Sequence, residues 1–318
     1  MRRLLLLLIA AIMTSGAAAC TSGPTSPPAP ISNASVQSFE ALKKITGPDF
    51  SVLAVADPYK AAEFLFDGSY KQTAEVTNGV NGPDGDWIDS SGNEYLAQFG
   101  ARNVVEYTKK TAEENGAPNF TYDSGLTNPV GVTTDTSHNI FVADGGGGYT
   151  SGSIFEFRQH ANKPIASCGT GLFNAGVVVD PSGSVFVSGD NPRYGPGYLI
   201  EFKNGLKSCK AKTLPVSLKS TGGLQMDNAG DLVACAETTG VYIIPPPYKA
   251  VRSIITGTFN SYNAALTQDN KLIFIADPHN SDVAVDDYPS GKRVMTLSAS
   301  LSGPFGVATF PYQKAKDR

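Results

Sequence analysis

The stretch GPFGVATF, residues 303–310, stands near the end of the 318-residue chain. It has the form of the opening of a structural unit, with a turn at Pro304, a glycine at Gly306 and then a short run suited to a β-strand. Only eight residues follow it, and most of them are charged or polar. We therefore expect the unit that begins here to be completed by strands from another part of the chain.

The same form recurs along the sequence at nearly constant intervals. The segments NPVGVTTDTSHNIFVAD (128–144) and FNAGVVVDPSGSVFVSG (173–189) align without gaps, and weaker copies lie on both sides of them. Each copy begins at an anchor position that is glycine in all copies but one: Gly85, Gly131, Gly176, Gly223, Ala264 and Gly306. Subtracting these numbers gives intervals of 46, 45, 47, 41 and 42 residues. The sequence is thus an array of similar units.

Each unit has the same internal order of strands and turns. A short strand begins at the anchor, a turn such as DSSGN or DPSGS reverses it, and a second, mostly apolar strand follows. A third strand and a less distinct fourth complete the unit. Four antiparallel strands in this length are typical of one blade of a β-propeller. The anchor is glycine because innermost strands converge on a narrow central channel.

The first blade lacks its innermost strand. The segment VLAVADPYKAAEFLFD (52–67) matches a second and a third strand, with Asp57 in the place that Asp144 has in its own unit. Gly131 precedes Asp144 by 13 residues, so the missing anchor would be at position 44, which is Lys44. We predict an all-β, six-bladed β-propeller of four-stranded antiparallel blades, in which residues 303–310 complete the N-terminal blade. Such closure removes exposed sheet edges.

The N-terminus has the pattern of an export signal. Arg2 and Arg3 precede an apolar run at 4–13, and small residues follow up to Cys20. This resembles a bacterial lipoprotein signal, which implies lipidation of Cys20, although Ala17 stands where the usual motif prefers leucine. We expect a signal peptide at 1–20, a Pro/Ser/Thr-rich tether and short lead-in at 21–48, and the propeller at 49–318. The protein would be exported and lipid-anchored in the bacterial cell envelope, or secreted without lipidation.

The repeat pattern also resembles a known class of propellers. Its elements are Pro-x-Gly-Val, an Asp-x-x-Gly-Asn turn, an apolar strand and an aspartate, and they resemble the NHL-repeat and gluconolactonase-like six-bladed propellers over about residues 50–310. A hard-cation site of the gluconolactonase type needs three or four converging oxygen ligands. No local motif around the ligands of that class is matched here. The three histidines are also too scattered to build the His-rich metal site of propeller amidating lyases.

Two polar residues interrupt an otherwise apolar channel mouth. The residues just before the anchors are mostly apolar, and Asp84 and Asn263 are the exceptions. They flank the closure blade, so we expect them to form a polar cluster with Asp57, Asp277 and His279 on one side of the funnel. A bound metal would use Asp84 and Asn263. The alternative for Asp57 and Asp277, which share one repeat position, is that each accepts hydrogen bonds from its own loop.

Other residues suggest a recognition rim and a cross-link. Tyr149, Arg193 and Tyr194 lie in loops of neighbouring blades and would form the rim, unless these loops are simply solvated. Cys168 and Cys209 lie in comparable outer regions of adjacent blades, so a disulfide between them is expected in an oxidising compartment.

The sequence favours binding over catalysis. A net charge of −4 argues against a nucleic-acid partner, and membrane contact is expected only through the lipid anchor. We expect a monomeric binding module for a protein or glycan partner, with no cofactor. The alternative is a hydrolase or lactonase that depends on calcium or another divalent cation and works in the funnel.

Overall fold

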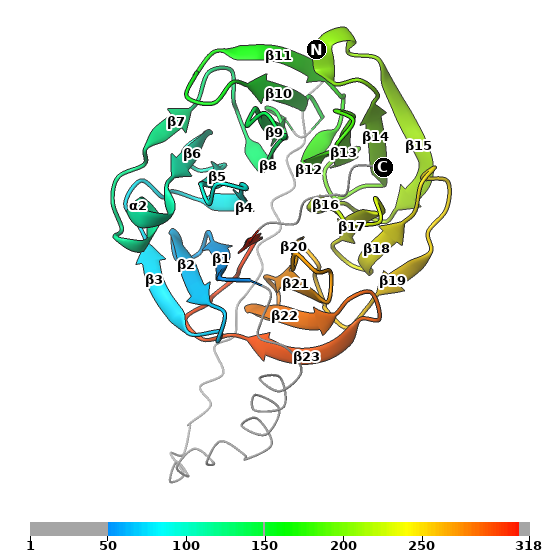
Figure 1. Ribbon diagram of the computed structural model, residues 1–318. Coiled ribbons are helices and arrows are strands. Elements are labelled where there is room, and N and C mark those ends of the chain that lie inside the picture. The colour runs from blue at the N-terminus through cyan, green and yellow to red at the C-terminus, as the bar shows by residue number, and fades with distance from the viewer. Residues whose placement is uncertain (1–49, 149, 312–318) are drawn as a thin grey trace, which may run out of the picture.

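The computed structural model describes residues 50–148 and 150–311. Six sheets of four antiparallel strands each are arranged radially around a central axis, as Figure 1 shows. Cys20, Tyr149 and the expected tether lie outside the described residues. Within the described part of the chain, no helix is long and apolar enough to cross a membrane.

The six blades follow one another along the chain. From the innermost strand outward, blade 1 consists of β24 (Gly306–Phe310), β1 (Val52–Asp57), β2 (Ala62–Asp67) and β3 (Gln72–Val76). Blade 2 consists of β4 (Pro83–Ile88), β5 (Glu94–Gln98), β6 (Asn103–Tyr107) and β7 (Phe120–Tyr122). Blade 3 consists of β8 (Pro129–Thr134), β9 (Ile140–Asp144), β10 (Ser153–Phe157) and β11 (Pro164–Gly169). Blade 4 consists of β12 (Phe173–Val179), β13 (Val185–Asp190), β14 (Gly197–Phe202) and β15 (Ala211–Leu218). Blade 5 consists of β16 (Leu224–Met226), β17 (Leu232–Ala236), β18 (Gly240–Ile244) and β19 (Ser253–Ile255). Blade 6 consists of β20 (Asn263–Leu266), β21 (Leu272–Asp277), β22 (Asp282–Asp287) and β23 (Lys292–Leu297).

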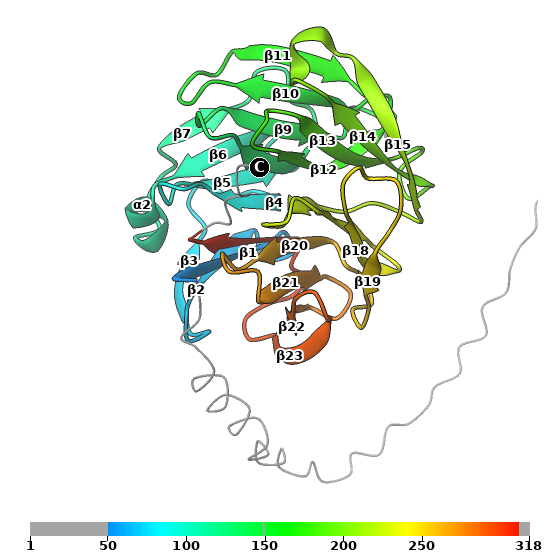
Figure 2. The ribbon, with the colours of Figure 1, turned by 45° about the vertical axis from the view of Figure 1, so that its right-hand side comes forward.

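The predicted closure is confirmed. The C-terminal strand β24 pairs antiparallel with β1, with Gly306 opposite Ala56 and Phe310 opposite Val52. Both views show this strand, drawn in red, between β1 and the centre of the ring (Figures 1 and 2). The segment 303–310, which begins like a repeat unit but is too near the end of the sequence to complete one, therefore supplies the innermost strand of blade 1.

The anchor glycines mark places where innermost strands approach one another closely. A Cβ at Gly85 would overlap the carbonyl oxygen of Val130 in the next blade, and a Cβ at Gly306 would overlap that of Asp84. These obstructing atoms are backbone atoms, which cannot rotate away as a side chain could. Only glycine fits such positions.

The core lies mainly between neighbouring blades, and a disulfide adds a covalent link. Apolar side chains of adjacent sheets pack into continuous clusters, such as the one joining blades 4 and 5 through Phe186, Leu224 and Ile244. A disulfide joins Cys168 on β11 to Cys209, which follows the short 3₁₀ helix η1 (Leu206–Ser208). This bond links blade 3 to blade 4.

A short helix was not predicted from the strand pattern. Helix α2 (Lys109–Glu113) lies between β6 and β7, and the Thr108 hydroxyl accepts a hydrogen bond from the Thr111 N–H at its start. The segment KKTAEENG carries good helix formers after a capping threonine, so local propensity explains the helix.

Candidate functional site

The site lies where the six innermost strands begin. The loops that enter these strands, and the loops between the second and third strands, share this end of the propeller because the strands of each blade alternate in direction. We call this end the mouth face. It is formed by loops of variable length on a rigid scaffold, which is where binding residues commonly lie.

Asp84 is the central polar residue at the mouth. Strand β4 contains a bulge here, because Asp84 and Gly85 together oppose the single residue Ala97 of β5. Asp84 is 4% exposed, and its Oδ2 accepts a hydrogen bond of 3.3 Å from the Tyr262 hydroxyl. Burial raises the pKa of Asp84 to about 8, against the lowering effects of Tyr262 and Arg193. Asp84 is therefore largely neutral at pH 7 and can donate a hydrogen bond.

Three further charged or polar groups surround Asp84. Arg193 interacts electrostatically with Asp84 and with Glu237, and Tyr262 is influenced by all three. Burial, with a contribution from Asp190, raises the pKa of Glu237 to about 7. Burial likewise raises the pKa of the Tyr262 phenol. The Arg193 guanidinium thus lies near the carboxyl groups of Asp84 and Glu237, whose pKa values are both raised. Clusters of groups with shifted pKa values are common in functional sites.

Aromatic rings pack around the same groups, and we call this part of the mouth face, around Asp84, Arg193 and Tyr262, the funnel. The Arg193 guanidinium lies 4.5 Å from the ring centroid of Phe173 and 4.7 Å from that of Tyr194. Tyr262 packs against Phe305 with ring centroids 4.3 Å apart, and Phe305 in turn meets Tyr59 edge-on. Cation–π contact and ring packing hold these groups in place before any ligand arrives.

The aromatic character extends from the funnel over the mouth face. The described residues include seven large apolar side chains that are exposed. Five of them lie at the mouth end of their blades, in loops or at a strand start: Tyr59, Phe99, Tyr194, Tyr198 and Phe259. The other two, Ile165 and Ile254, lie on outer strands. The exposed apolar surface is therefore concentrated on one face.

The five residues expected to form a polar cluster have different interaction partners in the structure. The Asp57 carboxylate accepts hydrogen bonds from the backbone N–H groups of Tyr59, Lys60, Ser302 and Gly303. The hydrogen bonds from Ser302 and Gly303 hold the loop before β24 against blade 1. The Asp277 carboxylate accepts hydrogen bonds from Phe259, Asn260 and Asn280. Both carboxylates organise loops, as their shared repeat position suggested.

His279 and Asn263 have different surroundings from Asp84. His279 is exposed and stacks on Phe259 with ring centroids 3.8 Å apart. Asn263 is buried in the mouth, and its Oδ1 accepts a hydrogen bond from the Ala264 N–H. The residue that contacts Asp84 is Tyr262, the neighbour of Asn263.

This donor set does not fit a hard cation in the funnel. Such an ion takes six to eight oxygen ligands in the case of calcium, and the carboxylates of Asp57 and Asp277 are already saturated by N–H donors. Asp84 and Asn263 alone supply too few oxygens. The funnel is better suited to bind a polar group between an arginine, two protonatable acids and aromatic faces.

Sequence reasoning named Asp84, Arg193 and Tyr194 but missed Glu237 and Tyr262. Glu237 follows strand β17, and Tyr262 precedes β20. Their approach to Asp84 brings separate blades together, and no repeated position in the sequence predicts it. The sequence does give one signal for Tyr262, namely its place beside Asn263 at the mouth.

Comparisons with known proteins identify the fold. No protein-family model matches the chain, and no curated protein sequence matches it. Among solved structures, the chain is similar to one from a nidogen/laminin complex, with a TM-score of 0.64 and 15% identity over 81% of this chain and 97% of that one. It is also similar to a protein of unknown function from Bacteroides caccae, with a TM-score of 0.62 and 12% identity over 82% and 98% of the two chains.

A third similar structure is a protein provisionally assigned as a gluconolactonase. It matches with a TM-score of 0.58 and 11% identity, covering 86% of this chain and 89% of that one. At these identities the likeness establishes the six-bladed propeller fold, and a propeller fold is shared by many unrelated functions.

Proposed function

We propose that the protein is a binding module that docks a protein partner on its mouth face, with the funnel around Asp84 and Arg193 at the centre of the contact. The observation that carries this proposal is the gathering of five of the seven exposed large apolar side chains on that face. Tyrosine, phenylalanine and arginine are enriched where proteins bind one another.

The spread of these side chains favours a protein over a small ligand. Tyr59, Phe99 and Tyr194 lie in blades 1, 2 and 4, and Phe259 lies between blades 5 and 6, so the exposed rings are spread around the mouth face. A small molecule would use only the funnel. The likeness to a chain of the nidogen/laminin complex agrees with a binding role, at the level of the fold alone.

The proposal includes export and a lipid anchor at Cys20. The support is the signal pattern of residues 1–20 and the Cys168–Cys209 disulfide, since disulfides persist in oxidising compartments. An anchored propeller on a tether would present its mouth face to partners in the envelope. Metabolic labelling with a fatty-acid analogue tests this part, because Cys20→Ser should abolish labelling.

The binding proposal is tested by comparing two matched double variants. Tyr194→Ser with Phe259→Ser removes two exposed aromatic groups from the mouth, and Ile165→Ser with Ile254→Ser removes two exposed apolar groups from outer strands. Affinity purification from the native envelope should recover a partner with the wild type and the outer-strand variant, and lose it with the mouth variant.

Two outcomes would contradict the proposal. The first is a partner recovered equally well by both variants. The second is specific, mouth-dependent binding on a glycan array with no protein partner, which would make the module a glycan receptor.

A further inference from the structure

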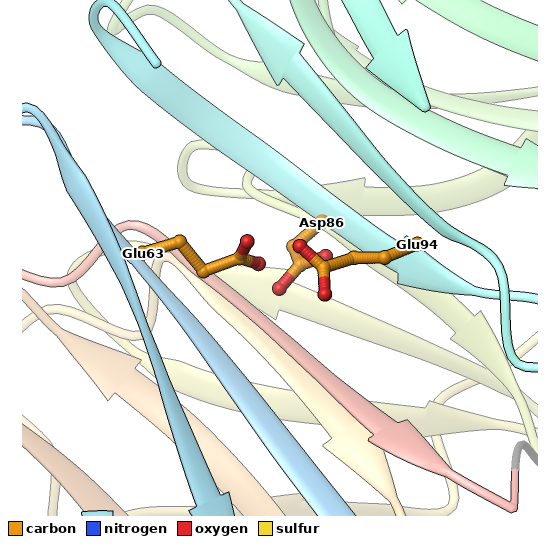
Figure 3. Close-up of side chains that lie close together, drawn as sticks. All are labelled: Glu63, Asp86 and Glu94. Atoms are coloured by element: carbon orange, nitrogen blue, oxygen red, sulfur yellow. The ribbon is translucent and has the colours of Figure 1, made fainter. Parts of the chain in front are cut away.

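Three carboxyl groups meet inside the interface between blades 1 and 2. Glu63 lies on β2, Asp86 on β4 and Glu94 on β5. Each is at most 3% exposed, and Figure 3 shows the three side chains pointing toward one another. The register explains part of the arrangement, because Asp86 pairs with Leu96 and Ile88 with Glu94, which puts Asp86 and Glu94 on one face of blade 2.

The surroundings of these acids are apolar. The same interface contains Ala54, Ala56, Leu65, Val76, Ile88 and Leu96, all buried. No ion pair in the described part of the chain involves any of the three carboxyl groups. The nearby Tyr107 hydroxyl donates its hydrogen bond to the carbonyl oxygen of Asn78 instead.

The hydrogen-bonding capacity of Glu63 is unused. Neither of its carboxylate oxygens has a hydrogen-bond donor among the described residues, and the same holds for both oxygens of Asp86 and for Oε1 of Glu94. Buried polar atoms nearly always have a partner, and an uncompensated buried charge costs several kcal/mol. Three such groups aimed at one point therefore indicate a positively charged occupant.

The spacing of the oxygens suits a single metal ion. One oxygen from each residue can be chosen so that all three lie within 4.8 Å of one another. Oxygens bound to one ion at about 2.3–2.6 Å can be separated by up to twice that distance, so one calcium ion can contact all three without a change of fold. Three carboxylates can supply up to six oxygens if each binds through both.

We propose that Glu63, Asp86 and Glu94 bind a divalent cation that prefers oxygen ligands, with Ca²⁺ the expected ion, and that this ion clamps blade 1 to blade 2. The site adjoins the ring closure, because a Cβ at Gly306 of β24 would lie 3.0 Å from Cβ of Asp86. Ion binding would therefore strengthen the ring at the seam made by the C-terminal strand. This role is separate from binding at the mouth face.

One of the three acids, Glu94, also borders the region beside helix α2. Glu94 lines a small pocket there together with Gly92, Lys109, Ala112 and Phe310. Glu63 and Asp86 do not line this pocket, so an ion that exchanges through it would meet Glu94 first. Exchange makes the site accessible to a chelator.

The competing explanation is that the three carboxyl groups are protonated and bind no ion. Burial and mutual repulsion raise the pKa of Glu63 and Asp86 well above their usual range, and burial raises that of Glu94. Three neutral carboxyl groups could then share hydrogen bonds with one another. The two explanations differ in metal content and in the effect of a chelator.

The first test uses the wild-type mature protein at pH 7.5. Elemental analysis of protein purified without chelator should find about one divalent ion per chain. EDTA should lower the melting temperature by about 5–10 °C, the shift for an ion present at roughly 100 times its dissociation constant. Readdition of Ca²⁺, Mn²⁺, Mg²⁺ or Zn²⁺, each alone, identifies the preferred ion. No metal and no chelator effect would overturn the proposal in favour of protonated acids.

The second test locates the ion. Glu63→Gln with Asp86→Asn should lose the metal and the response to EDTA, whereas Glu75→Gln, an exposed acid on β3 of the same blade, should keep both. A Glu63/Asp86 variant that retained the ion and the full chelator shift would place the ion elsewhere and overturn the proposal. The wild-type measurement decides the question if the double variant does not fold.

Discussion

The substitution Gly306→Ala tests the ring closure with a single methyl group. The new Cβ would overlap the carbonyl oxygen of Asp84 and lie 3.0 Å from the Cβ atoms of Ala56 and Asp86, where about 3.5–4.0 Å is optimal between carbon atoms. The obstructing oxygen belongs to the backbone of β4, so strand β24 has to move as a whole. Overpacking of this kind costs typically 1–3 kcal/mol, and we expect a loss of about 3 kcal/mol in the free energy of unfolding.

The assay is thermal unfolding followed by near-ultraviolet circular dichroism. For a domain of this size a loss of about 3 kcal/mol corresponds to a fall in melting temperature of about 6–12 °C. The matched control is Gly169→Ala at the end of β11, because no atom lies within 4 Å of the added Cβ and the backbone there has no positive φ. The control should melt within about 2 °C of the wild type. Equal melting of the two variants would refute the close approach of β24 and β4.

Three further perturbations have definite expected outcomes. Burial raises the pKa of Glu237 from 4.5 to about 7, so the folded state holds this proton more tightly than the unfolded state and stability falls as pH rises from about 4.5 to about 7. Glu237→Gln should flatten that part of the pH profile of unfolding and stabilise the protein at pH 8 by about 1–2 kcal/mol, after allowance for solvent screening; an unchanged profile would show that Glu237 titrates normally. Replacing Cys168 and Cys209 by serine opens a loop with a separation of 41 residues and should cost about 4 kcal/mol; denaturant unfolding measures this loss, and an unchanged midpoint would contradict it. Deleting residues 303–318 removes the whole of β24, and normal cooperative melting of the truncated protein would be incompatible with closure by this strand.

Periodicity made the fold predictable. Gly85, Gly131, Gly176 and Gly306 recur because an added Cβ would meet the backbone of the next innermost strand. The offset between an anchor and its aspartate then showed that Lys44 could not begin the first blade. Fold and closure thus followed from constraints that every blade repeats.

The candidate site was only partly predictable because it lies outside the repeat. Asp84 could be recognised as a polar exception at a repeated position, but Tyr262 and Glu237 reach it from loops whose lengths differ between blades. In the sequence, Glu63 is simply an acidic residue near the start of strand β2, AEFLFD, and nothing beside it indicates a partner. Its approach to Asp86 and Glu94 depends on the rotation of blade 1 against blade 2, which no local pattern reveals.

The central claim, that the mouth face binds a protein partner, is tested most directly by site-specific photo-crosslinking in the native envelope. A photoreactive amino acid is placed at Phe259 on the mouth face in one protein and at Ile254 on outer strand β19 in another, both exposed positions. We expect a discrete protein adduct from position 259 and none from position 254. Adducts from position 254 alone, or the same adducts from both positions, would contradict the claim.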